Sequence, residues 1–161
     1  MIDSTDRKIL DILQEDARTP NSEIARQVGM VPSAVCERIR KLRGKGIIQN
    51  YEARVDAARV GLPLLAFVFV RTEELAGAAE AGPELKKIPE ILEVYNIAGE
   101  DCYLVKIRVR DTAELGRLIR ETIGRIPSVR STRTTIVLET YKETNRLPLV
   151  EEKEPDKTIA D

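Results

Sequence analysis

Two short stretches of the chain concentrate residues that could do chemistry. Residues 99–103, GEDCY, place a glycine, two carboxylates, a thiol and a phenol between two apolar runs. Such a set fits a catalytic cluster, a metal site, an ordinary hairpin turn or a small-molecule sensor. Residues 38–45, RIRKLRGK, hold five basic side chains and no acid. This run predicts an anion-facing surface, with a solvated helix face as the plain alternative.

The composition argues against the common types of catalytic and metal-binding site. The chain has no histidine, so it lacks the usual general base near neutral pH and the commonest transition-metal ligand. Its two cysteines, Cys36 and Cys102, predict neither a disulfide framework nor a zinc site. No base lies beside Cys102 in the sequence, and we expect both thiols to pack as small apolar groups. We therefore expect no enzyme, no cofactor and no metal.

The bulk sequence suits a water-soluble protein with more than one part. No apolar run approaches the roughly 20 residues that span a bilayer. The start, MIDSTDRKIL, is unlike a signal peptide, and we expect a cytoplasmic protein. The hydrophobic period changes along the chain, which predicts a first domain at 1–60, a second at 61–145 and an acidic tail at 146–161.

The first domain predicts three helices. Asp3 should cap the first helix. Thr19 should cap the second, with Pro20 as its first helical residue and Gly29 at its end. Pro32 should begin the third. A short helix, a tight turn and a helix with small residues first and basic residues last form a helix-turn-helix pattern. The segment after Gly46 reads as extended, which gives a winged helix-turn-helix. The inner stripe of the third helix is Val35, Ile39 and Leu42.

The second domain alternates strands and helices. Strands are predicted at 64–71, 91–98, 102–110 and 129–142, with one helix within 73–88 and another capped by Asp111. The order β-α-β-β-α-β predicts a ferredoxin-like sandwich, so the whole chain is α+β. GEDCY then becomes the turn between the second and third strands. Both helices cover one sheet face, and the apolar other face predicts a homodimer or larger assembly.

These residues resemble a known family. Residues 3–56, DSTDRKIL through NYEARVD, resemble the DNA-binding half of the Lrp/AsnC (feast/famine) transcription regulators. EVYNIAGEDCYLVKIRV followed by IPSVRSTRTTIVLETYK resembles their effector-sensing half. The resemblance implies a prokaryotic, nucleoid-associated regulator whose dimers often assemble into tetramers or octamers. It also implies binding of double-stranded operator DNA and a response to an amino acid lodged between dimers.

The sequence departs from the family pattern at two positions. Val31 stands where the family usually has a serine that caps the third helix, and the loss of such a cap costs about 0.5–2 kcal/mol. Cys102 stands where the family often has an aspartate, and the acid has moved to Asp101. We therefore expect Asp101 or Glu100 to bind the ammonium group of an effector. Backbone N–H groups at the glycine turn would bind its carboxylate.

The candidate sites follow from these readings. Arg38 is the best candidate for a base edge, with Lys41, Arg43 and Lys45 nearer the phosphates. Glu37 either reads cytosine or restrains Arg38. The predicted DNA-binding residues are Ser22, Ser33, Ala34, Glu37, Arg38, Lys41, Arg43 and Lys45. The predicted effector-binding residues are Gly99, Glu100, Asp101, Cys102 and Tyr103, with Arg130, Thr132 and Thr134 projecting from one face of the last strand of the same or a neighbouring subunit. The alternative function is a metabolite-sensing or architectural oligomer without specific operator binding.

Overall fold

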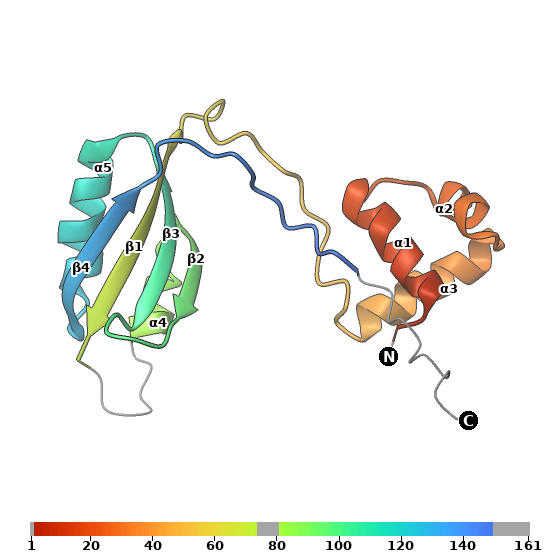
Figure 1. The fold of residues 1–161 in the computed structure, drawn as a ribbon, viewed down its shortest axis with the longest axis horizontal. Helices are drawn as coiled ribbons and strands as arrows, with labels where there is room; N and C mark the ends of the chain where they lie inside the picture. Colours follow the sequence, from red (N-terminus) through yellow and green to blue (C-terminus); the bar gives the residue numbers. More distant parts are fainter. Residues whose placement is uncertain (1, 74–80, 150–161) are drawn as a thin grey trace, which may run out of the picture. The chain divides into compact units, whose positions relative to one another are not determined.

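The computed structural model describes residues 2–73 and 81–149, and these form two compact units (Figure 1). One unit comprises the described residues up to Ala53 together with the described part of the C-terminal segment that begins at Glu143. The other unit spans Arg54–Lys142. No helix of the described residues is long and apolar enough to cross a membrane.

The first unit is built from three helices, α1 (Ser4–Glu15), α2 (Asn21–Val28) and α3 (Pro32–Gly44). Asp3 caps α1, and Gly29 ends α2 in the left-handed region at φ 69°, as predicted. The prediction for Thr19 is wrong by one residue: Pro20 is the N-cap of α2, and the Thr19 hydroxyl donates instead to the Asp16 carbonyl, 2.8 Å away. Four buried side chains hold the helices together, namely Ile9, Ile24, Ala25 and Val35.

The segment after α3 carries no strand. None of residues 47–63, all of them described, belongs to a ladder, so the predicted wing is an unpaired segment. Its larger apolar side chains, Tyr51, Val55 and Val60, are exposed. An extended segment needs a neighbouring strand to become part of a sheet, and no described strand pairs with residues 47–63.

The second unit is a four-stranded antiparallel sheet with helices, and it confirms the ferredoxin-like β-α-β-β-α-β prediction. Its strands are β1 (Leu64–Thr72), β2 (Ile91–Asn96), β3 (Tyr103–Val109) and β4 (Val129–Ile136). Its helices are α4 (Ala81–Leu85), α5 (Thr112–Arg117), the π-helix η1 (Leu118–Thr122) and the 3-10 helix η2 (Ile123–Arg125). The strands lie in the order β2-β3-β1-β4. Part of the helix predicted within 73–88 falls on residues outside the described ranges.

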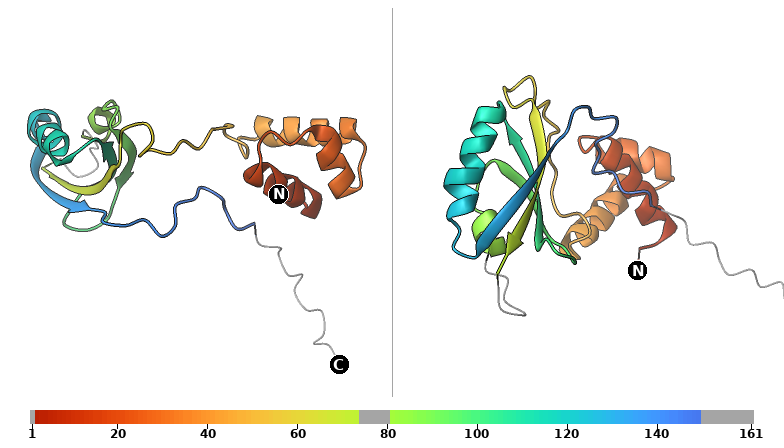
Figure 2. Two further views of the ribbon diagram at one scale, coloured as in Figure 1. Left: turned by 90° about the horizontal axis from the view of Figure 1, so that it is seen from above. Right: turned by 60° about the vertical axis from the view of Figure 1, so that its left-hand side comes forward.

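The helices cover only one face of this sheet (Figure 2). Val68 and Val70 of β1 and Val105 and Ile107 of β3 are fully buried beneath them. Because side chains alternate along a strand, the residues between these point to the other face. There Phe67, Phe69 and Leu104 are only half-buried, and Tyr95 is exposed. One unit therefore leaves an apolar strip on its helix-free face.

Candidate DNA-binding and effector sites

The first turn of α3 is largely exposed and includes two short side chains. Val31 is the N-cap with no side-chain hydrogen bond and 62% of its surface exposed, and Pro32 occupies the first turn. Ser33 is exposed and Ala34 is half-buried. Ser22, in the first turn of α2, is exposed as well. The short side chains at both helix starts leave room for a close approach to a nucleic-acid backbone.

Glu37 binds Arg40 and not Arg38. The Arg40 Nε and Nη2 donate to the two Glu37 oxygens at 2.9 and 2.7 Å. The Lys41 Nζ lies 3.7 Å from the same carboxylate. The hydrogen bonds from Arg40 foremost, with the charges of Arg40 and Lys41, hold the pKa of Glu37 below its usual range. Glu37 thus restrains Arg40, a residue absent from the predicted set although the i,i+3 spacing on α3 could have suggested it.

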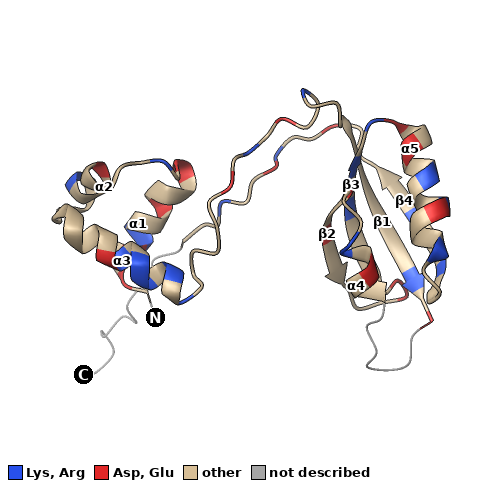
Figure 3. Ribbon diagram, turned by 180° about the vertical axis from the view of Figure 1, so that it is seen from behind, with Lys and Arg blue, Asp and Glu red and all other residues tan. Residues whose placement is uncertain are grey.

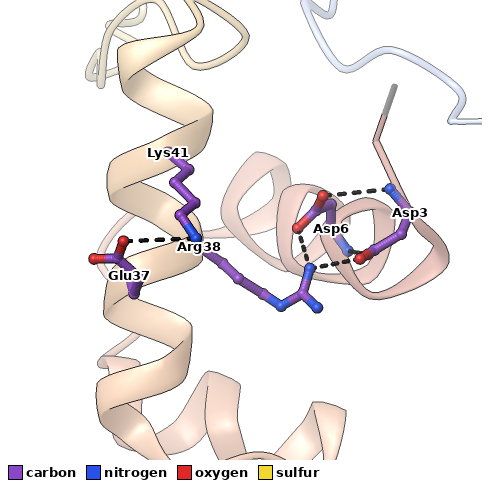
Figure 4. Close-up of polar contacts among 5 residues, drawn as sticks. All are labelled: Asp3, Asp6, Glu37, Arg38 and Lys41. Carbon is purple, nitrogen blue, oxygen red and sulfur yellow. Dashed lines mark hydrogen bonds and ion pairs between the residues drawn. The ribbon is translucent and has the colours of Figure 1, made fainter.

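Arg38 points back from α3 to the beginning of α1. Its Nη1 donates to the Asp3 Oδ2 and to the Asp6 Oδ1, each at 2.7 Å (Figure 4). Both hydrogen bonds raise the pKa of the guanidinium, the one from Asp3 more strongly. The residue expected to reach a base edge is therefore engaged within its own unit. The sequence could not have indicated this pairing, because 35 and 32 residues separate the partners.

The C-terminal part of α3 is rich in basic residues (Figure 3). Lys41, Arg43 and Lys45 are exposed, and the Arg43 guanidinium carbon lies 6.0 Å from the centre of the Tyr51 ring. An open groove of about 320 Å³ lies on this flank. Its lining includes the cations of Arg38, Lys41 and Lys45 and two carboxylates, Asp6 and Glu37, which are held by Arg38 and Arg40. The flank presents a positive surface that suits phosphate groups.

The predicted sensing turn is a six-residue hairpin loop between β2 and β3. The Ile97 N–H donates to the Cys102 carbonyl at 2.9 Å, and the Cys102 N–H donates to the Val70 carbonyl at 3.0 Å. Gly99 has φ 136°, a conformation that side-chain-bearing residues rarely adopt. Glu100 is exposed at the tip. The loop ends are thus fixed by backbone hydrogen bonds, while its tip presents a free backbone and a carboxylate.

Asp101 reaches a residue that the sequence reading missed. Its Oδ2 accepts from the Arg133 Nη2 at 2.8 Å, and the same guanidinium lies 4.0 Å from the centre of the Phe69 ring. Phe69 and Arg133 are direct partners across β1 and β4. Alternation along β4 puts Arg133 on the face opposite to that of Thr132 and Thr134, but only the strand register shows that this face meets the turn.

The other expected effector residues lie elsewhere. Tyr103 is 2% exposed in the core, where its ring approaches Gly82. Thr132 and Thr134 pair with Val70 and Val68, so they share the helix-covered face and not the face of Asp101. Arg130 forms an ion pair with Glu73 at 2.7 Å. Within one chain the predicted set is therefore split between the two faces of the sheet.

The cysteines differ from expectation in part. Cys36 is exposed on α3, so the core-packing prediction for it is wrong, because it lies off the inner stripe of that helix. Cys102 is half-buried, with its Sγ 3.6 Å from the Thr72 carbonyl oxygen. Within residues 2–73 and 81–149 no three histidine, cysteine or acidic side chains gather as metal ligands do.

A three-helix unit with an exposed basic third helix, joined to a ferredoxin-like unit, defines a helix-turn-helix transcription regulator with a separate sensing domain. Residues 2–43 match the AsnC-type helix-turn-helix domain and residues 65–147 match the Lrp/AsnC ligand binding domain. The chain belongs to the Lrp/AsnC family.

Named relatives and solved structures agree. The HTH-type transcriptional regulator FL11 of Pyrococcus horikoshii is 42% identical over 149 residues, which cover 92% of this chain and 97% of the relative. The Leucine-responsive regulatory protein of Escherichia coli is 37% identical, covering 91% and 90%. A transcriptional regulator of Neisseria meningitidis, solved as a complex with L-Met, superposes with a TM-score of 0.84 at 31% identity, covering 92% and 97%.

Proposed function

We propose that this regulator binds operator DNA through the exposed flank of α3 and that a small α-amino acid, bound at the 97–102 loop, modulates the binding. The accessible basic end of α3 supports the DNA contact. In this proposal Ser33 and Glu37 would face the base edges, and the exposed Lys41, Arg43 and Lys45 would face the phosphates. Ser22 and the first N–H groups of α2 provide a second phosphate contact.

The effector site rests on the chemistry of the loop tip. Asp101 is held by Arg133, whereas the structure gives Glu100 no partner among the described residues. Glu100 is therefore the better acceptor for a ligand ammonium. The backbone around Gly99 is open, with nothing within 4 Å of the place where a Cβ would stand. Such a turn can offer N–H groups to a carboxylate. A relative solved with L-Met makes an amino acid the fitting ligand class.

The DNA contact is tested by the salt dependence of binding to a duplex that the wild-type protein selects from a random-sequence pool. Lys45→Ala should weaken binding to every sequence and lower the slope of log K against log salt by about one. Lys86→Ala, which removes an exposed lysine of the other unit, should leave both unchanged. An unaltered slope for Lys45→Ala would contradict the contact, and failure to select any duplex would favour the architectural alternative.

The effector site is tested by thermal shift with L-methionine, L-leucine and the other common amino acids. A ligand at a hundred times its Kd adds about 2.7 kcal/mol of stability. Gly99→Ala should abolish that shift, because an alanine strains the loop at φ 136°. Gly61→Ala is the matched control, since Gly61 also has a positive φ, 85°, with nothing within 4 Å. Equal loss in both variants would argue against a site at the loop.

A further inference from the structure

Two carboxylates at the start of α1 meet on a single nitrogen of Arg38 (Figure 4). The Asp3 Oδ2 and the Asp6 Oδ1 each accept from the Arg38 Nη1 at 2.7 Å. The Arg38 side chain is 30% exposed and that of Asp6 is 17% exposed, so this contact is partly shielded from water. Asp3 is more open, at 52%.

The remaining oxygens of both carboxylates are already in use. The Asp6 N–H donates to the Asp3 Oδ1 at 2.7 Å, and the Asp3 N–H donates to the Asp6 Oδ2 at 3.3 Å. This reciprocal pair is a capping box, which satisfies backbone donors at the start of α1. Each carboxylate therefore has one oxygen on its own helix and one on Arg38. Neither can turn to follow the guanidinium without breaking the cap.

We infer that Arg38 is a positioning residue: the capping box of α1 holds it, and through it fixes where α3 presents Ser33, Glu37 and Lys41. This inference rests on the proposed DNA contact by α3 and deepens it. Helix packing alone leaves some freedom to slide or rotate, because the shared core of the three helices is small. An ion pair fixed at both ends removes that freedom. For Arg38 to reach a base edge, it would have to abandon two charge-assisted hydrogen bonds.

The direction in which DNA affinity changes when Asp6 is neutralised separates the positioning role of Arg38 from a direct contact with DNA. Asp6→Asn removes a negative charge from the DNA-binding unit, so simple electrostatics would strengthen DNA binding. If Arg38 instead reads DNA, freeing it from Asp6 would also strengthen binding. The positioning role predicts the opposite, a three- to tenfold loss of affinity for the selected duplex. Asp11→Asn, the same change at a half-buried site on α1, should leave affinity within twofold of wild type.

A double-mutant cycle and the salt slope complete the test. Arg38→Met should weaken binding without changing the salt slope, and Asp6→Asn combined with Arg38→Met should bind no worse than Arg38→Met alone. A slope lowered by about one in Arg38→Met would show that Arg38 contacts DNA itself and would overturn the inference. So would tighter binding by Asp6→Asn.

A measurement on the free protein keeps the inference testable even if a variant loses stability or no duplex is selected. Amide hydrogen exchange in α3 should accelerate in Asp6→Asn relative to Asp11→Asn, with α2 unchanged. Equal exchange in α3 would overturn the inference. If Lys45→Ala leaves DNA binding intact, the proposed contact fails. If Lys45→Ala weakens binding while Asp6→Asn strengthens it, the contact stands and the positioning role fails.

Discussion

At the scale of single residues, Glu23 gives the first unit a measurable response to acid. Its Oε1 accepts from the Arg26 Nη2 at 2.6 Å and from the Gln27 Nε2 at 2.9 Å. These hydrogen bonds, with that of Arg26 first, lower the pKa of Glu23 to about 2. A carboxyl with a lowered pKa in the folded state stabilises the fold above its unfolded pKa. That contribution disappears as the pH falls from about 4.5 toward 2.

Glu23→Gln should therefore reduce the stability of the protein at pH 6 and approach wild-type stability near pH 2. Glutamine keeps the shape of the side chain but removes the titrating charge. The difference should be small, since the Glu23 and Arg26 side chains are 38% and 74% exposed and solvent screens such pairs. Urea unfolding followed by far-UV circular dichroism between pH 6 and 2 measures it. A constant difference across this range would contradict the lowered pKa.

Residue-level pairings divide into those that the sequence can predict and those that it cannot. Glu37 with Arg40 and Glu23 with Arg26 follow from helical spacing, because residues three apart on a helix are neighbours. Arg38 with Asp3 and Asp101 with Arg133 join elements far apart in the chain, 35 and 32 residues. Only the packing of α1 on α3, and the β1–β4 register, bring those side chains together.

At the scale of elements, α3 begins without the side-chain cap that most helices have. Val31 has the extended φ −83°, ψ 148° of an N-cap, which a serine can adopt without strain. Val31→Ser should stabilise the first unit by about 0.5–1 kcal/mol, since its hydroxyl can accept from a backbone N–H of the first turn. Val31→Ala is the control, because it shortens the side chain without adding an acceptor. Thermal unfolding should show a higher Tm for serine alone, and equal midpoints for the two variants would rule out the cap.

The segment after β4 shows where element boundaries escape sequence patterns. Residues 146–161 read as a frayed acidic end, yet the described part reaches back to α1. The Leu147 N–H donates to the Gln14 Oε1 at 2.7 Å, and the Gln14 Nε2 donates to the Leu147 carbonyl at 3.2 Å. One amide side chain thus satisfies both backbone groups of a residue 133 positions away. No periodicity encodes such a contact.

At the scale of the whole molecule, the order of strands and helices was predictable because each has its own period. The continuous apolar run at 64–71 and the alternating run at 103–109 indicate strands, and the Asp111 cap marks α5. What the pattern could not give was which face of β4 meets the 97–102 loop. The neighbours of a β4 side chain depend on the register of the strands. The register of β1 against β4 shifts between Arg71 and Thr72, which changes the pairing within one strand.

The helix-free face of the sheet also supports an assembly prediction. Leu104 lies at the centre of that face, paired with Phe69 on one side and Tyr95 on the other. A second copy packed there would bury these side chains, and a stable interface of this kind needs about 800 Å² from each partner. The carboxylates of this face, Glu93 and Asp101, already pair with Lys106 and Arg133. A lysine at position 104 would therefore add an unpaired buried charge, which costs several kcal/mol. Leu104→Lys should therefore weaken self-association at least a hundredfold in sedimentation velocity over a range of concentrations.

Thr134→Lys, the control, places the same charge on the other face of the sheet and should leave association unchanged. If both variants sediment like wild type, the copies meet elsewhere, and the apolar strip on this face needs another explanation.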